Sequence, residues 1–115
     1  VQNVGKGQMM NTKQQLEEAT QKKHDIPGDL ICFYQPILHG PIEEYGKVIR
    51  CSFNELPTRE FDDGFGGIEG EPCIAFSPRF VYIKIQYDGS EWFEAIPRHP
   101  ESLNEYDSIP WPGGG

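Results

Sequence analysis

The strongest constraint on the fold is a β-hairpin signal in the second half of the sequence. Two strand-like runs, Arg79–Tyr87 and Ser90–Ile96, flank the dipeptide Asp88-Gly89. Alternating side chains on both sides of an Asp-Gly pair are typical of two antiparallel strands joined by a tight turn. The sequence therefore predicts an antiparallel sheet that contains this hairpin.

The register of the hairpin follows from which face it buries. A two-residue turn would set Ile83 opposite Glu94 and Lys84 opposite Phe93, so neither face would be apolar. A three-residue loop would collect the apolar side chains on one face, namely Val81, Ile83, Ile85, Phe93 and Ala95. Because a shift of one residue inverts every side chain, burial favours the three-residue loop, Tyr87-Asp88-Gly89.

This register predicts a candidate protein-binding face on the other side of the hairpin. That face would carry aromatic and charged side chains: Phe80, Tyr82, Lys84, Trp92, Glu94 and Ile96. Aromatic rings bury area while their polar tips stay hydrated, which is typical of protein-recognition surfaces. Lys84 and Arg98 are expected to be rim charges that set orientation. The alternative is that the C-terminal tail covers this face.

The remaining elements indicate an α+β domain. Thr12 as N-cap and Gln15 three residues on predict a helix over Thr12–His24, which Pro27-Gly28 would stop. Its apolar face is only Leu16 and Ala19, so we expect it to pack at an edge or end of the sheet.

Three further strands are predicted, at Leu30–Tyr34, Lys47–Phe53 and Cys73–Phe76, with loops at 35–46 and 55–72. We therefore predict one N-terminal helix followed by a small antiparallel sheet of about 4–5 strands with a C-terminal β-hairpin. The single domain is expected over residues 11–100. Residues 1–10 are expected to be disordered or foreign to the natural chain, and 101–115 to form an extended or disordered tail.

Net charge is concentrated in the second half of the sequence. Residues 1–53 hold six acids and six bases, whereas residues 54–115 hold twelve acids and four bases, which gives the whole net charge of −8. Such a field repels nucleic-acid backbones and membrane headgroups and attracts basic partners. We therefore expect a protein partner with a basic surface, and no nucleic acid or membrane.

No recognised catalytic or metal motif is present in the sequence. Cys32, Cys51 and Cys73 have no C-x-x-C spacing and are expected to be free thiols of a cytoplasmic protein. The acidic, glycine-rich loop 55–72 lacks the spacing of a calcium loop and has no Gly-Lys-Ser/Thr for a phosphate. We expect no catalytic residue, no metal and no cofactor.

The sequence favours a small non-enzymatic protein-binding module, an inhibitor or accessory factor. Two alternatives stay open. One is a small-ligand-binding or enzymatic domain with a site at loop 55–72, using His39, Asp62, Asp63 or His99. The other is a homo-oligomeric structural protein that uses the same face for self-association.

Overall fold

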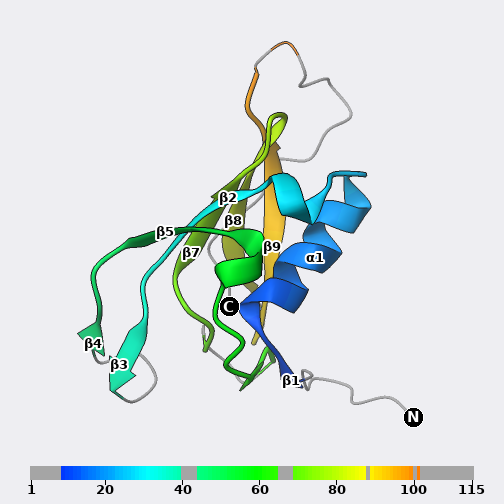
Figure 1. Ribbon diagram of the computed structural model, residues 1–115. Helices are drawn as coiled ribbons and strands as arrows, with labels where there is room; N and C mark the ends of the chain where they lie inside the picture. The colour runs from blue at the N-terminus through cyan, green and yellow to red at the C-terminus, as the bar shows by residue number, and fades with distance from the viewer. Residues whose placement is uncertain (1–8, 40–43, 65–68, 88, 100, 102–115) are drawn as a thin grey trace.

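The computed structural model describes residues 9–39, 44–64, 69–87, 89–99 and 101. Its main sheet has five antiparallel strands in the order β5-β2-β7-β8-β9 (Figure 1). These strands are β2 (Ile31–Tyr34), β5 (Ile49–Ser52), β7 (Cys73–Phe76), β8 (Phe80–Tyr87) and β9 (Ser90–Pro97). The predicted α+β class, with a helix followed by an antiparallel sheet and a C-terminal hairpin, is confirmed.

Helix α1 spans Thr12–Lys22 and packs against β9 at one side of the sheet. Its N-cap is Asn11, one residue before the predicted Thr12: the Asn11 side chain accepts from the Gln14 N–H, and the Gln14 side chain accepts from the Asn11 N–H. The Thr12 hydroxyl is instead buried and donates to Glu71. The helix ends before the predicted His24, which adopts a left-handed φ of 57°.

The hairpin register predicted from burial is wrong. Tyr87 pairs directly with Ser90, so two residues connect β8 and β9, and Gly89 has a φ of 84°. Ile83 lies opposite Glu94 and Lys84 opposite Phe93, which is the pairing that the sequence argument rejected. The Asp-Gly turn preference therefore decides the register, and the sheet accommodates Lys84 on its inner face.

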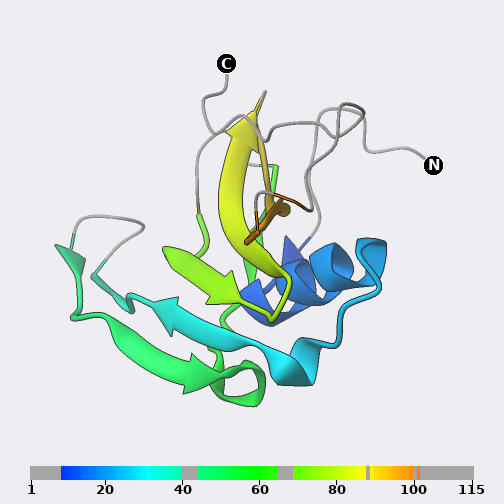
Figure 2. The same ribbon diagram turned by 90° about the horizontal axis from the view of Figure 1, so that it is seen from above.

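The two regions predicted as loops contain further strands. Within 35–46, β3 (Ile37–His39) pairs with β4 (Glu44–Tyr45) and extends the β2–β5 ribbon beyond a break at Pro36 and Gly46. There the Gly46 N–H donates to the Pro36 carbonyl at 2.8 Å. Figure 2 shows this ribbon curving away from the helix.

Within 55–72, β6 (Phe61–Asp62) pairs with β1 (Met9–Met10). Met10 is buried, so Met9 and Met10 belong to the folded domain and not to a disordered lead. Short 3₁₀ turns at Pro27–Asp29 and Phe53–Glu55 complete the secondary structure. Residues 1–8 and the tail 102–115 lie outside the described residues.

The core lies between α1 and the inner face of the sheet. Its buried residues come from the helix, from the position after each 3₁₀ turn and from four strands: Leu16, Ala19, Leu30, Cys32, Leu56, Ala75, Tyr82, Phe93 and Ala95. The alternation of residues 47–53 puts Ile49, Cys51 and Phe53 on one side of the predicted strand; Cys51 and Phe53 pack against this cluster, whereas Ile49 is 40% exposed. In the described part of the chain, no helix is both long and apolar enough to cross a membrane.

Candidate interaction surface

The inner face of the hairpin holds three of the residues that were predicted to bind a partner. Phe80, Tyr82 and Lys84 alternate on β8 and point toward the helix, because Tyr82 pairs with Ala95 and Lys84 with Phe93. Tyr82 is 0% exposed, and its hydroxyl donates to the Asp25 carboxylate at 2.5 Å. The predicted docking face is therefore not a surface of this protein.

Lys84 lies in a polar network beneath α1. Its ammonium group donates to the Glu91 carboxylate at 2.8 Å and to the Gln15 side-chain carbonyl at 3.0 Å. Glu91 also accepts from the backbone N–H groups of Glu69 and Gly70, so the network fixes one end of the acidic loop to the hairpin. Lys84 is therefore a structural cation, and not the rim charge that the sequence suggested.

The other three predicted residues lie elsewhere. Trp92 and Glu94 alternate with the core residues of β9 and share the side of the sheet that faces away from α1, where the Trp92 indole N–H donates to Glu94 at 2.6 Å. Arg98 follows β9 and lies over the Phe76 ring at 5.9 Å from its centroid. The structure thus divides the predicted set between two faces.

We call the side of the sheet that faces away from α1 the outer face. The cross-strand pairs place apolar side chains of four neighbouring strands on it: Ile31, Phe33, Ile74, Phe76, Val81, Ile83, Ile85, Trp92 and Ile96. Ile31 is 42% exposed, Ile85 is buried, and the others are half-buried. Because extended apolar faces mark binding surfaces, this face is a functional candidate.

Aromatic rings and arginines form a row across the outer face. Phe33 and Phe76 make an edge-to-face contact, with centroids 5.9 Å apart and ring planes at 89°. The Arg50 guanidinium lies 5.7 Å from the Phe33 centroid, and Arg98 covers Phe76 at the other end of the row. Arginines stacked on aromatic rings place charges at fixed positions on an otherwise apolar surface, and these charges can orient a bound partner. Arginine and aromatic residues are both enriched at protein interfaces.

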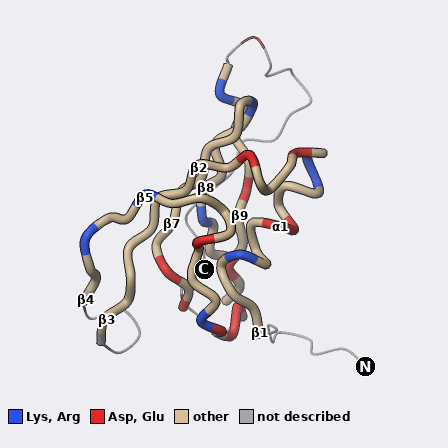
Figure 3. Tube along the Cα trace, viewed as in Figure 1, with Lys and Arg blue, Asp and Glu red and all other residues tan. Residues whose placement is uncertain are grey.

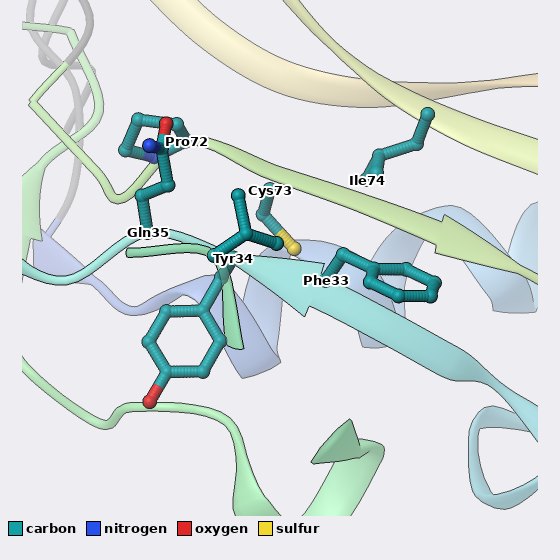
Figure 4. Close-up of a pocket in the computed structure, with 7 residues that line it drawn as sticks. Phe33, Tyr34, Gln35, Pro72, Cys73 and Ile74 are labelled. Carbon is teal, nitrogen blue, oxygen red and sulfur yellow. The ribbon is translucent and has the colours of Figure 1, made fainter. Parts of the chain in front are cut away.

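A small pocket of about 230 Å³ opens at the end of the outer face where β5, β2 and β7 meet. It is lined by Phe33, Tyr34, Gln35, Val48, Pro72, Cys73 and Ile74. Figure 4 shows its side chains coming from the neighbouring strands β2 and β7, with the Cys73 sulfur directed toward the β2 side chains. This volume suits one apolar side chain of a partner and is small for a cofactor.

Comparison of the chain with protein-family models, with curated proteins and with solved structures finds no significant match.

The residues proposed for a ligand or catalytic site do not line this pocket. Asp62 accepts a hydrogen bond from the Gly64 N–H, while His99 is exposed just beyond β9. His39 belongs to β3, and Asp63 accepts at its carbonyl from the Glu91 N–H. Among the described residues, no group of three or more His, Cys, Asp and Glu side chains is placed to hold a metal ion.

The acidic loop is partly folded into the protein. Of its carboxylates, Glu71 is buried and accepts from Arg59 at 2.8 Å and from the Thr12 hydroxyl at 2.7 Å. Of the other acids of this loop, Glu60 is exposed, whereas Asp62, Asp63 and Glu69 are half-buried. Figure 3 shows Asp and Glu gathering near β1, while the β4–β5 ribbon carries Lys and Arg.

The outer face could have been found from the sequence with the correct register. Ile74 and Phe76, Val81 and Ile83, and Ile31 and Phe33 each occupy alternate positions of a strand. The two-residue register was rejected at the sequence level because neither face of the hairpin would then be apolar, which put Val81, Ile83 and Ile85 on the buried face. The buried ion pair of Lys84 with Glu91 shows that the inner face can accommodate this charge.

Proposed function

We propose that this chain is a non-enzymatic protein-binding module, an inhibitor or accessory factor that docks its partner through the outer face. The observation that carries the proposal is the largely apolar side of β2, β7, β8 and β9, interrupted by Glu94 and crossed by the Arg50–Phe33–Phe76–Arg98 row. Such a surface supplies apolar area together with a few orienting charges, which is how protein interfaces are built.

The pocket beside Phe33 and Ile74 supports an anchoring role for this end of the face. Binding energy at interfaces is concentrated in a few side chains that fill well-packed pockets. This pocket of about 230 Å³ has room for a single leucine, isoleucine or aromatic side chain of the partner. The remaining contacts would exclude water around that anchor.

Charge supports a partner with a mixed, mainly basic surface. The net charge of −8 steers a basic partner toward the molecule, and the acids that gather near β1 (Figure 3) would face its cations. Lys47 and Arg50 at the opposite end would face acids.

All three cysteines are free thiols, which supports a reducing compartment such as the cytoplasm as the place of action.

The test is affinity capture with matched surface variants. Ile74→Glu introduces a charge into the apolar face and its pocket, whereas Gln21→Glu makes the same change of charge on an exposed position of α1. We expect the wild-type protein and Gln21→Glu to retain the same partner from an extract of the source cells. Ile74→Glu should retain at least about tenfold less, because a charge buried without a partner is strongly unfavourable.

A second readout uses Trp92 on the outer face. In a Trp111→Phe background, Trp92 is the remaining tryptophan, and its emission should shift to the blue when the captured partner covers the face. Equal capture by Ile74→Glu and wild type, together with an unchanged Trp92 spectrum, would exclude the outer face as the docking surface. Light scattering of the isolated protein tests the homo-oligomer alternative, since a dimer through this face would mask Trp92 without any partner.

A further inference from the structure

We propose that the partner contributes an extended segment that adds to the free edge of β5 as a sixth strand, with an acidic residue opposite Arg50. This inference rests on the proposed protein-binding function and names the recognition mode. β5 is the last strand of the sheet, and among the described residues no segment pairs with its far side.

The backbone groups that face outward from β5 can be identified from the ladder. The Gln35 N–H donates to the Pro72 carbonyl, so alternate residues from Gln35 back to Ile31 direct their backbone groups toward β7. Cys32 and Tyr34 then face β5 and bond to their register partners Cys51 and Ile49. Arg50, between these two partners, directs its N–H and carbonyl away from β2.

Ser52 provides an independent check of this assignment. By the same alternation its N–H points away from β2, and it donates to the Glu55 carboxylate at 2.9 Å. The Ser52 donor is therefore already satisfied by its own chain. Arg50 and, one alternate position earlier, Val48 offer the backbone groups that an added strand would use.

The side chains along this edge define the partner's chemistry. Val48 is 61% exposed and Ile49 40% exposed, although both are large and apolar. Residues 47–52 carry two cations, Lys47 and Arg50, and no acid, in a chain of net charge −8. The edge is thus complementary to a segment that is apolar and locally acidic.

The antiparallel arrangement of the whole sheet gives the order of the recognised residues. A segment running antiparallel to β5 meets Arg50 first, then Ile49, then Val48. We therefore expect an acidic residue followed by two apolar β-formers, such as Glu-Val-Ile. The residue opposite Val48 would share the outer face with the rim of the pocket, since Val48 lines it.

The test selects peptides from a phage-displayed library of random dodecapeptides on the immobilised full chain. We expect enrichment of an acid followed by two apolar residues, and replacement of the acid by Lys or Arg when the selection is repeated on Arg50→Glu. Absence of this motif, or the same motif on both proteins, would overturn the proposal.

Measuring the affinity of an enriched peptide for Arg50→Ala and for Arg50→Pro separates the contribution of the Arg50 side chain to binding from that of its backbone N–H. Arg50→Ala removes one exposed ion pair and should weaken binding about threefold. Arg50→Pro also removes the outward N–H but no ladder bond to β2, so the fold should survive, as circular dichroism will show. We expect it to abolish measurable binding; equal affinities of the two variants would contradict strand addition.

Two further outcomes distinguish this inference from the proposed function. If the captured partner is lost from Ile74→Glu but retained by Arg50→Pro, the outer face still binds protein and the strand-addition proposal fails. If light scattering shows a dimer that Arg50→Pro dissociates, the occupant of the edge is a second copy of the chain. That result would contradict the proposal that an acidic segment of a partner binds the edge of β5.

Discussion

Lys84 and Glu91 form an ion pair of 2.8 Å between the two strands of the hairpin, with side chains 7% and 0% exposed. The pair is completed by Gln15 from the helix and by backbone donors from the acidic loop. Three segments far apart in the sequence, the helix, the acidic loop and the hairpin, are therefore joined at one buried polar centre. In the described part of the chain, every buried side-chain nitrogen and oxygen has a hydrogen-bond partner.

Removing one member of this pair should destabilise the protein strongly. Lys84→Met leaves the Glu91 carboxylate buried without its cation, and Glu91→Leu leaves the Lys84 ammonium group buried without its anion. Each substitution should lower the free energy of unfolding by about 3–5 kcal/mol. The double variant should recover part of that loss, because no unpaired charge remains. Urea unfolding of the wild type, the two single variants and the double variant gives the four free energies of unfolding. If the loss in the double variant equals the sum of the two single losses, the two charges do not stabilise one another.

Asp25 should make stability depend on acid pH. Burial raises the pKa of Asp25, but hydrogen bonds from Tyr82 and Ser77 and the nearby Arg79 outweigh it, so the pKa lies below 3.8. A lowered folded-state pKa gives stability that is present above the unfolded value and lost as the pH falls through the folded value. Asp25→Asn should therefore cost about 1–2 kcal/mol at pH 7.

That cost should shrink as the pH falls below 3.8, where wild type loses the same contribution. Denaturant unfolding of wild type and Asp25→Asn at pH 7 and pH 2.5 (about 1 unit below the ordinary value) checks the prediction. Tyr82→Phe removes the main donor and should lessen the pH dependence. A constant difference between the two proteins across this range would contradict the assignment.

Cys32 should resist chemical modification in the folded protein. It is 0% exposed, and burial, followed by the neighbouring Cys51, raises the pKa of its thiol to about 12. Since the thiolate is the nucleophile, iodoacetamide at pH 8 should label Cys32 only at the rate at which the protein opens. Mass spectrometry of digested samples gives the rate at each cysteine. Half-buried Cys51 serves as the internal control and should react before Cys32.

Gly70 should not tolerate a side chain, whereas Gly28 should. A Cβ at Gly70 would lie 2.5 Å from Cζ of Phe61 and 2.9 Å from Nζ of Lys84, while one at Gly28 meets nothing within 4 Å. Gly70→Ala is therefore expected to lose about 1–3 kcal/mol through overpacking. Thermal unfolding of both alanine variants tests this. A Gly70→Ala protein as stable as Gly28→Ala would show that Phe61 can move aside.

Local chemistry determined much of the secondary structure. The Asp88-Gly89 pair predicts the connection between β8 and β9, and the strands predicted at Leu30–Tyr34 and Lys47–Phe53 correspond to β2 and β5. Strand and turn preferences act between near neighbours, so these elements can be read from the sequence. The α+β class follows from their order.

Tertiary structure alone decided which face of the hairpin is inside. The sequence shows Lys84 as a charge among apolar residues, but its acceptors Gln15 and Glu91 lie 69 and 7 positions away. A buried cation is acceptable only where such partners converge, and that convergence exists only after α1 packs against β9. Long-range pairing of polar groups, which no local pattern encodes, therefore placed Tyr82 in the core and the apolar row of Phe33 and Phe76 on the outer face.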